Sequence, residues 1–305
     1  MNERSFIDPA IPRKSEIIDR ALTTGPEAMP LPSVVEVSES GTCNRSCDFC
    51  PRSIPGFPNV KEFIEPALID SVSLQLEEVG FAGIFLFSGF VEPLLDKKIF
   101  EHVKTIRRNL SKGRIEIVTN GDSLNKTRLR RLFDAGLSTL LISVYDGPED
   151  AERLGSMCRS IGLLDDQYLI RHRYLPPEED FGITLSNRAG MMEGAKFSIP
   201  ATRQAVQGSC YYPHYTFFFD YLGDVLMCPH DWGKKHIVGN LKRQTFKEIW
   251  TGSLFDTARQ RLRHGDRNFS PCNVCDVKGA LMGKRHVEAW ESYWDNMSAM
   301  PAATK

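Results

Sequence analysis

The sequence lacks an excess of either charge, and it lacks a long apolar run. Its 305 residues include 38 Lys plus Arg and 39 Asp plus Glu, which gives a formal net charge of −1. Without a basic excess, bulk charge cannot drive counterion release from a nucleic acid, so we expect no nucleic-acid partner. The longest nearly apolar stretch, residues 79–91, is shorter than the roughly 20 residues that a membrane helix needs, so we expect no membrane partner.

An apolar leader of the secretory type is missing as well. Residues 1–14 are polar, and no signal-peptide core follows them. We therefore expect a cytoplasmic protein, in which cysteines at fixed spacing bind metal more often than they form disulfides. The even total of 8 cysteines, which would suggest disulfides in a secreted chain, then needs another explanation.

Seven of the cysteines fall into two groups, and Cys158 stands alone. The groups are a Cys-x3-Cys-x2-Cys motif near the start and four cysteines near the end: Cys43, Cys47 and Cys50, then Cys210, Cys228, Cys272 and Cys275. Four thiolates complete a zinc site or ligate an iron–sulfur cluster, whereas three leave one position open. Two structural zinc sites, the first completed by a histidine such as His102, are one interpretation.

Short apolar runs alternate with amphipathic ones over the first two thirds of the chain. The expected strands are residues 34–38, 83–87, 114–118, 138–144, 168–174 and 182–185, and the expected helices are 64–79, 100–110, 124–135 and 149–161. Repeated strand–helix units predict an α/β fold with a parallel sheet, open or closed into a barrel. The functional site of such folds lies at the carboxyl ends of the strands.

Distinctive polar and glycine residues follow those predicted strand ends. They occupy residues 43–50, 88–93, 119–122 and 143–146, one group after each of the first four strands. A purely structural metal would not require this convergence, so we expect a functional site at this edge.

The pattern changes near residue 200. Residues 215–227 predict a β-hairpin that turns at Gly223 and Asp224, and helices are expected at 245–250 and 253–263. We expect an N-terminal extension (1–32), a barrel domain (33–200), a small second domain (201–285), and a C-terminal helix and tail (286–305). The tail after Ser298 is expected to be disordered.

The first cysteine motif, with Phe49 before its last cysteine, resembles that of the radical S-adenosylmethionine (SAM) enzymes. The resemblance implies a partial (β/α)6 barrel and a [4Fe–4S] cluster whose open iron binds SAM and cleaves it to a 5′-deoxyadenosyl radical. The positions that match the family's SAM site are Phe49, Gly89, Glu92, Thr119, Asn120 and Ser143. Residues 89–92 read Gly-Phe-Val-Glu and depart from the family's Gly-Gly-Glu element.

The C-terminal cysteines resemble those of the short twitch form of the SPASM domain, a β-hairpin plus helix. This implies a second [4Fe–4S] cluster, fully ligated by Cys210, Cys228, Cys272 and Cys275. Nearly the whole chain resembles the branch of the 2-deoxy-scyllo-inosamine dehydrogenases and related aminocyclitol-antibiotic oxidases. In that branch the position of Arg188 lies at the substrate and those of His230 and Asp231 face it, although an acidic residue stands in place of His230.

The resemblance implies an oxidoreductase that converts a secondary alcohol of an aminocyclitol or amino sugar to a ketone. The radical would take the carbinol hydrogen, and the second cluster would accept an electron. Arg188 would hold the hydroxyl group, and His230 or Asp231 would accept its proton. The expected partners are a polyol or aminocyclitol substrate and a flavodoxin- or ferredoxin-type reductant.

Two other activities remain open at this point. An epimerase of amino sugars would return a hydrogen atom to the substrate, and Cys158 could supply it. A maturase of ribosomal peptides would need a recognition domain, for which the segment before Val34 is short. The mass of the product distinguishes a dehydrogenase from an epimerase.

Overall fold

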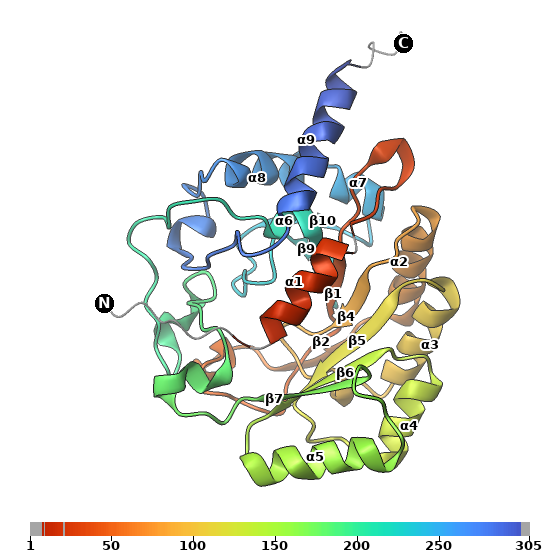
Figure 1. Ribbon diagram of the computed structural model, residues 1–305. Helices are drawn as coiled ribbons and strands as arrows, with labels where there is room; N and C mark the ends of the chain where they lie inside the picture. Colours follow the sequence, from red (N-terminus) through yellow and green to blue (C-terminus); the bar gives the residue numbers. More distant parts are fainter. Residues whose placement is uncertain (1–7, 9, 21, 300–305) are drawn as a thin grey trace.

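The computed structural model describes residues 8, 10–20 and 22–299, and one eight-stranded sheet organises them (Figure 1). The strand order is β10-β9-β8-β1-β4-β5-β6-β7. These strands are β1 (Val34–Ser38), β4 (Ile84–Phe87), β5 (Arg114–Thr119), β6 (Thr139–Val144), β7 (Tyr168–His172), β8 (Thr216–Asp220), β9 (Asp224–Leu226) and β10 (Ile237–Asn240). A separate antiparallel pair joins β2 (Ser40–Gly41) to β3 (Val60–Phe63).

Helices cover both faces of the sheet (Figure 1). The described helices are α1 (Ala10–Arg20), α2 (Pro66–Glu78), α3 (Ile99–Asn109), α4 (Lys126–Asp134), α5 (Pro148–Ser160), α6 (Tyr212–Tyr215), α7 (Phe246–Trp250), α8 (Ser253–Arg263) and α9 (Lys284–Ala299). Local signals set several of their ends. Pro66 and Pro148 begin helices at a position where a backbone donor is not needed, and Thr245 with Glu248 forms a capping box on α7.

The parallel part of the sheet confirms the first five predicted strands to within two residues. β1, β4, β5, β6 and β7 pair in parallel, and α2 to α5 pass along one face between them. The antiparallel hairpin of β8 and β9 is confirmed as well, with Gly223 at a left-handed φ of +85° in its turn.

The predicted sixth strand, residues 182–185, is wrong. This segment follows a 3-10 turn, and Gly182 has a φ of +73° with the carbonyl of His172 against its backbone, so no extended strand forms there. The place beside β1 belongs to β8, which pairs with it in parallel from Val34↔Thr216 to Ser38↔Asp220. The sheet therefore runs through the domain boundary expected near residue 200.

The two faces of the sheet have different chemistry. On the outer face Val35, Val37, Phe87 and Ile117 are buried in the main apolar core against α2 to α5. On the inner face the register places Glu36, Leu86, Glu116 and Phe218 in one row. Charged side chains inside a sheet are costly unless they have partners, so this row marks a face with polar contacts.

Helix α1 lies across this inner face, in front of β1 and β4 (Figure 1). Ile18 packs against Val34 and Tyr215, and Arg13 forms a two-pronged ion pair with Glu116 through contacts of 2.6 and 3.2 Å. Part of the expected N-terminal extension is thus integrated into the fold.

Two expectations concern the C-terminal region of the chain. Helix α9 starts at Lys284, two residues before the predicted C-terminal region, and continues through Ala299. The predicted tail beyond it, residues 300–305, lies outside the described residues. Within the described part of the chain, no helix has the length and apolarity needed to cross a membrane.

Candidate active site

The carboxyl ends of β1, β4, β5 and β6 surround one pocket, here called the rim pocket. It encloses about 750 Å³, part of it open to solvent, which is in the range of small-molecule sites. Every residue predicted to bind SAM borders it, and so do three cysteines: Phe49, Gly89, Glu92, Thr119, Asn120, Ser143, Cys43, Cys47 and Cys50. The structure brings these positions together, while their roles in binding stay predictions.

Glu92 ties two strand ends together. Its carboxylate accepts hydrogen bonds from the Thr119 hydroxyl (2.6 Å), the Asn120 amide (2.7 Å) and the Leu94 amide (3.0 Å). Two of these bonds occupy Oε1 and one occupies Oε2, so Oε2 keeps an acceptor position for a ligand. Burial raises the pKa of this carboxyl group, and its three donors oppose that shift.

The residues that depart from the Gly-Gly-Glu element shape the wall of the rim pocket. Gly89 has a φ of +86°, and a Cβ there would stand 3.0 Å from the Phe218 ring, so glycine is required. Phe90 packs on Trp232 with ring centres 4.4 Å apart, and both side chains border the pocket. An aromatic wall thus stands where the family pattern has a second glycine.

Arg45 is a rim residue that the sequence interpretation missed. Its guanidinium bonds Asp122 (2.6 and 2.8 Å) and Asp146 (2.9 Å), and it lies 5.0 Å from the Tyr145 ring centre. It therefore ties the cysteine loop to the ends of β5 and β6. The signal was present, since each aspartate is the last residue of a polar group that follows a predicted strand, 119–122 and 143–146.

The first cysteine group presents thiols to the rim pocket. Burial raises the pKa of Cys43 and Cys50, and burial together with the other two thiols raises the pKa of Cys47 to about 12. Three thiols that border one pocket are a set of soft ligands that suits iron and sulfide. His102 does not join them, because its Nε2 lies 3.0 Å from Asp96 in the buried core beside α3.

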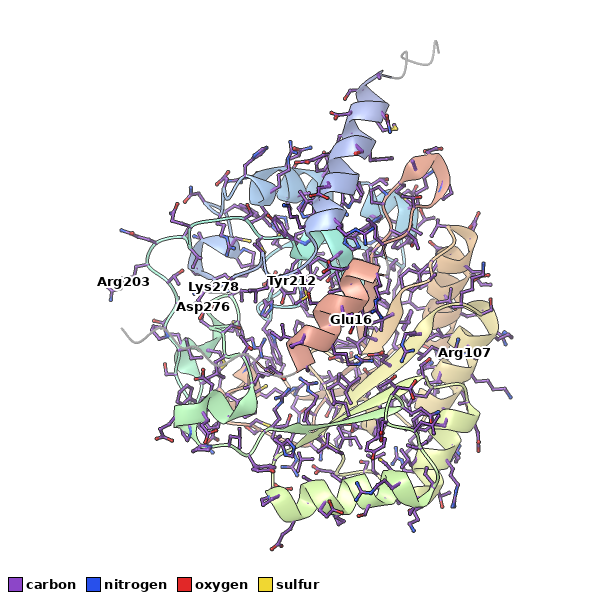
Figure 2. The ribbon with its side chains drawn as sticks, viewed as in Figure 1. Glu16, Arg107, Arg203, Tyr212, Asp276 and Lys278 are labelled. Atoms are coloured by element: carbon purple, nitrogen blue, oxygen red, sulfur yellow. The ribbon has the colours of Figure 1, made fainter. Side chains whose placement is uncertain are left out.

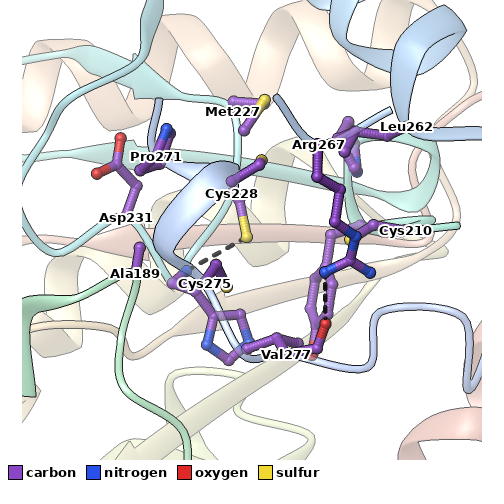
Figure 3. Close-up of a pocket in the computed structure, with 14 residues that line it drawn as sticks. Ala189, Cys210, Met227, Cys228, Asp231, Leu262, Arg267, Pro271, Cys275 and Val277 are labelled. Atoms are coloured by element: carbon purple, nitrogen blue, oxygen red, sulfur yellow. Dashed lines mark hydrogen bonds between the residues drawn. The ribbon is translucent and has the colours of Figure 1, made fainter. Parts of the chain in front are cut away.

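A second pocket, here called the thiol pocket, is bordered by the four C-terminal cysteines (Figure 3). Burial raises the pKa of all four thiols: Cys210, Cys228, Cys272 and Cys275. Arg267 holds their segments together by donating to the carbonyls of Val277 (2.8 Å) and Gly208 (3.0 Å). Gly279 passes so close to Cys210 that a Cβ would stand 2.1 Å from its sulfur.

The thiol donor set fits an iron–sulfur cluster, because four cysteine thiolates are its usual ligands and all four cysteines border this pocket. Within the described residues, no group of three or more Cys, His, Asp or Glu side chains has the arrangement of a single-ion site.

Arg188 and His230 lie where the two pockets meet. Arg188 borders the rim pocket and His230 borders the thiol pocket, and Arg188 Nη1 is 3.4 Å from His230 Nδ1. Asp231 also borders the thiol pocket, but its carboxylate accepts the backbone amides of Lys235 (3.0 Å) and His236 (2.7 Å). Asp231 thus stabilises the turn that follows Cys228.

Arg188 occupies a backbone conformation that non-glycine residues rarely adopt. Its φ is +47° and that of Ala189 is +53°, so the turn is strained. Asn187, fully buried, holds the turn: its side-chain amide donates to the carbonyl of Val274 (2.7 Å), and Asp276 accepts its backbone amide (2.9 Å). The loop of the second cysteine pair therefore positions Arg188.

Cys158, the proposed hydrogen donor of an epimerase, lies elsewhere. It is fully buried on α5 in the outer-face core and borders neither the rim pocket nor the thiol pocket. Burial raises the pKa of its thiol to about 11, as expected for a cysteine that serves as a small apolar residue.

Comparison with known proteins places the first cysteine group and the four C-terminal cysteines in two different family matches. Residues 38–165 match the family described as the radical SAM superfamily, and residues 210–276 match the SPASM family, an iron–sulfur cluster-binding domain. These matches confirm the expected succession of a radical SAM barrel and a cluster-binding domain of SPASM type.

Individual relatives match most of the chain. An S-adenosyl-L-methionine-dependent 2-deoxy-scyllo-inosamine dehydrogenase from Niallia circulans is 30% identical over 245 residues, which cover 80% of this chain and 92% of the relative. The crystal structure of BtrN in complex with AdoMet and 2-DOIA superimposes with a TM-score of 0.68 at 28% identity, covering 81% of this chain and 94% of that one. BtrN in an open conformation gives a TM-score of 0.59 at 24% identity, covering 85% and 97% of the two chains.

We expect each of the two cysteine groups to bind its own iron–sulfur cluster. Anaerobic reconstitution with iron and sulfide is expected to bind about eight irons and about eight sulfides per chain, as two four-iron clusters require. The variant that combines Cys43→Ala, Cys47→Ala and Cys50→Ala should keep about four of each, because the thiol pocket uses other residues. Iron and sulfide analysis measures both.

Cys158→Ala is the matched control, since it removes a buried thiol outside both pockets and should retain the full load. Zinc without sulfide in the wild-type protein would contradict the assignment.

Proposed function

The chain belongs to the radical SAM superfamily, and we propose that it oxidises a secondary alcohol of an aminocyclitol or amino sugar to a ketone. The observation that carries this proposal is the meeting of the rim pocket and the thiol pocket at Arg188 and His230. A substrate at this junction would be in reach of both sites. The named activity of the relative from Niallia circulans supports the substrate class and favours a dehydrogenase over an epimerase or a peptide maturase.

The enzyme uses SAM and [4Fe–4S] clusters, as members of its two families do. We propose that Cys43, Cys47 and Cys50 hold the cluster that binds SAM, and that the four cysteines of the thiol pocket hold the second cluster. When bound, these groups supply abstraction of a hydrogen atom from carbon and transfer of single electrons.

The oxidation also removes a proton, and this chain's own residues handle it. Overall, the carbinol carbon loses a hydrogen atom, the hydroxyl oxygen loses a proton, and one further electron leaves as the C=O bond forms. Arg188 cannot give up its proton, so it donates hydrogen bonds to the hydroxyl oxygen and orients it. His230 Nδ1 faces the Arg188 donor at 3.4 Å, which makes it the acceptor nitrogen and the candidate to take the proton.

The surroundings also define what this site excludes. The rings of Phe90 and Trp232 border the rim pocket, and Phe218 packs behind Phe90 with ring centres 5.0 Å apart. This apolar wall limits water around a reactive carbon. A flavodoxin- or ferredoxin-type protein is proposed to deliver the reducing electron, and the cytoplasm is the proposed location.

Product analysis tests the proposed function. Anaerobic reaction of the reconstituted enzyme with SAM, a reductant and 2-deoxy-scyllo-inosamine should yield 5′-deoxyadenosine and a ketone lighter than the substrate by two hydrogen atoms. Mass spectrometry identifies both. A product of unchanged mass that carries solvent deuterium on carbon would instead establish epimerisation.

Substitution of Arg188 tests the junction. Arg188→Ala removes the donor to the hydroxyl group, and the loss of a charged hydrogen bond should lower kcat/KM for ketone formation about 10- to 100-fold. Cleavage of SAM in the absence of substrate should persist, because the first cysteine group is intact. Liquid chromatography of 5′-deoxyadenosine and ketone separates the two activities.

Arg203→Ala is the matched control, because Arg203 is exposed and projects away from the site (Figure 2). It should leave both activities unchanged. Equal kcat/KM for the two variants would remove Arg188 from the substrate site.

A further inference from the structure

Helix α1 forms a wall of the sheet's inner face, although it lies outside the segments that match the two families, residues 38–165 and 210–276. Ile11 and Ile18 belong to the apolar cluster that packs on this face. The two-pronged ion pair of Arg13 with Glu116 fixes the rotation of the helix, with a shortest contact of 2.6 Å. Such a bidentate pair with a buried carboxylate has a defined geometry.

The next residue, Lys14, lies beside a ring that borders the thiol pocket. Its ammonium nitrogen is 5.6 Å from the ring centre of Tyr212, which is one of the residues around that pocket (Tyr212 is labelled beside α1 in Figure 2). Burial lowers the pKa of Lys14, and the charge of Glu36 opposes this shift. Whereas Arg13 has its carboxylate partner, Lys14 makes no ion pair within the part of the chain that the structure describes.

We refer to Lys14, Glu36, Arg188 and His230 as the junction group, because Arg188 and His230 lie where the pockets meet and Lys14 and Glu36 interact electrostatically with them. Glu36, on β1, is 6% exposed, and burial raises its pKa while Lys14, Ser88 and Arg188 oppose that shift. Burial, Arg188 and Lys14 all lower the pKa of His230. These mutual influences place Lys14 within electrostatic reach of the residues at the substrate junction.

Each member of the junction group can bind only certain functional groups of a ligand. A lysine ammonium and a guanidinium only donate hydrogen bonds, so Lys14 and Arg188 pair with oxygen and repel a protonated amine. Glu36 is the carboxylate of the group and accepts from hydroxyl or ammonium groups. An aminocyclitol carries both kinds of substituent on one ring.

Resting on the function proposed above, we propose that Lys14 is a specificity-determining residue that donates a hydrogen bond to a hydroxyl oxygen of the aminocyclitol. Helix α1, which packs on the inner face through Ile11 and Ile18, thereby contributes directly to substrate binding. This assigns a binding task to a segment that neither family match includes.

Lys14→Met tests the proposal, because methionine retains the length and packing of the side chain without its donor. With 2-deoxy-scyllo-inosamine as the probe, KM should rise about tenfold or more, as expected for loss of a charged hydrogen bond, while kcat changes less. Lys14→Arg keeps a cationic donor and should recover part of the lost affinity. Iron content and SAM cleavage without substrate should equal those of the wild type.

Arg20→Met is the matched control: it removes one charge from the exposed side of α1, where Arg20 forms an ion pair with Glu16. Its KM should equal that of the wild type. If Lys14→Met loses its thermal transition or its iron, Lys14→Leu, which also has no donor, replaces it under the same criteria.

The possible outcomes separate this inference from the function on which it rests. A wild-type enzyme that oxidises the aminocyclitol, together with Lys14→Met that shows the control's KM, overturns the role of Lys14 alone. A wild-type enzyme that cleaves SAM but oxidises no aminocyclitol overturns the proposed function and this inference with it.

Discussion

The parallel pairing of β8 with β1 is the constraint on which the arrangement of the site depends. β1 leads into the first cysteine loop, and β8 leads through its hairpin to Cys228, so the register Val34↔Thr216 to Ser38↔Asp220 sets the two cysteine groups relative to each other. The outer faces of both strands add Phe217 and Phe219 to the main core, which makes this register costly to shift. The barrel and the cluster-binding part are consequently one continuous sheet, which holds the two pockets in fixed positions relative to each other.

The inner face of that sheet carries charges that are compensated from outside the sheet. Glu116 pairs with Arg13, and the pKa values of Glu36 and Lys14 are shifted by burial in directions that the opposite charge resists. Burial of one unpaired charge would be unfavourable by several kcal/mol. We therefore regard these groups as one network of opposite charges, whose polar atoms can also bind a ligand. The strained backbone of Arg188, which a hydrogen bond from the Asn187 side chain to the carbonyl of Val274 stabilises, lies at the same junction.

Much of the fold and the metal chemistry could be predicted because the signals are local. Strands buried on both faces appear as apolar runs, and the Cys-x3-Cys-x2-Cys motif and the Cys272–Cys275 pair are each defined by spacing within a few residues. The false strand at 182–185 arose because two apolar residues outweighed Gly182, and the true neighbour of β1 could not be found because its pairing spans about 180 residues. Arg45 with Asp122, Asn187 with Val274 and Lys14 with Glu36 were missed for the same reason: each pair meets only in the folded chain.

Single turnover of Cys272→Ala shows whether the cluster proposed for the thiol pocket receives the second electron of the oxidation. The variant keeps the first cysteine group, so one equivalent of SAM should still be cleaved when the reconstituted protein is reduced in the presence of 2-deoxy-scyllo-inosamine. We expect 5′-deoxyadenosine without ketone, measured by mass spectrometry beside Cys158→Ala, which should form both. If Cys272→Ala forms as much ketone as that control, the thiol pocket is not the electron acceptor.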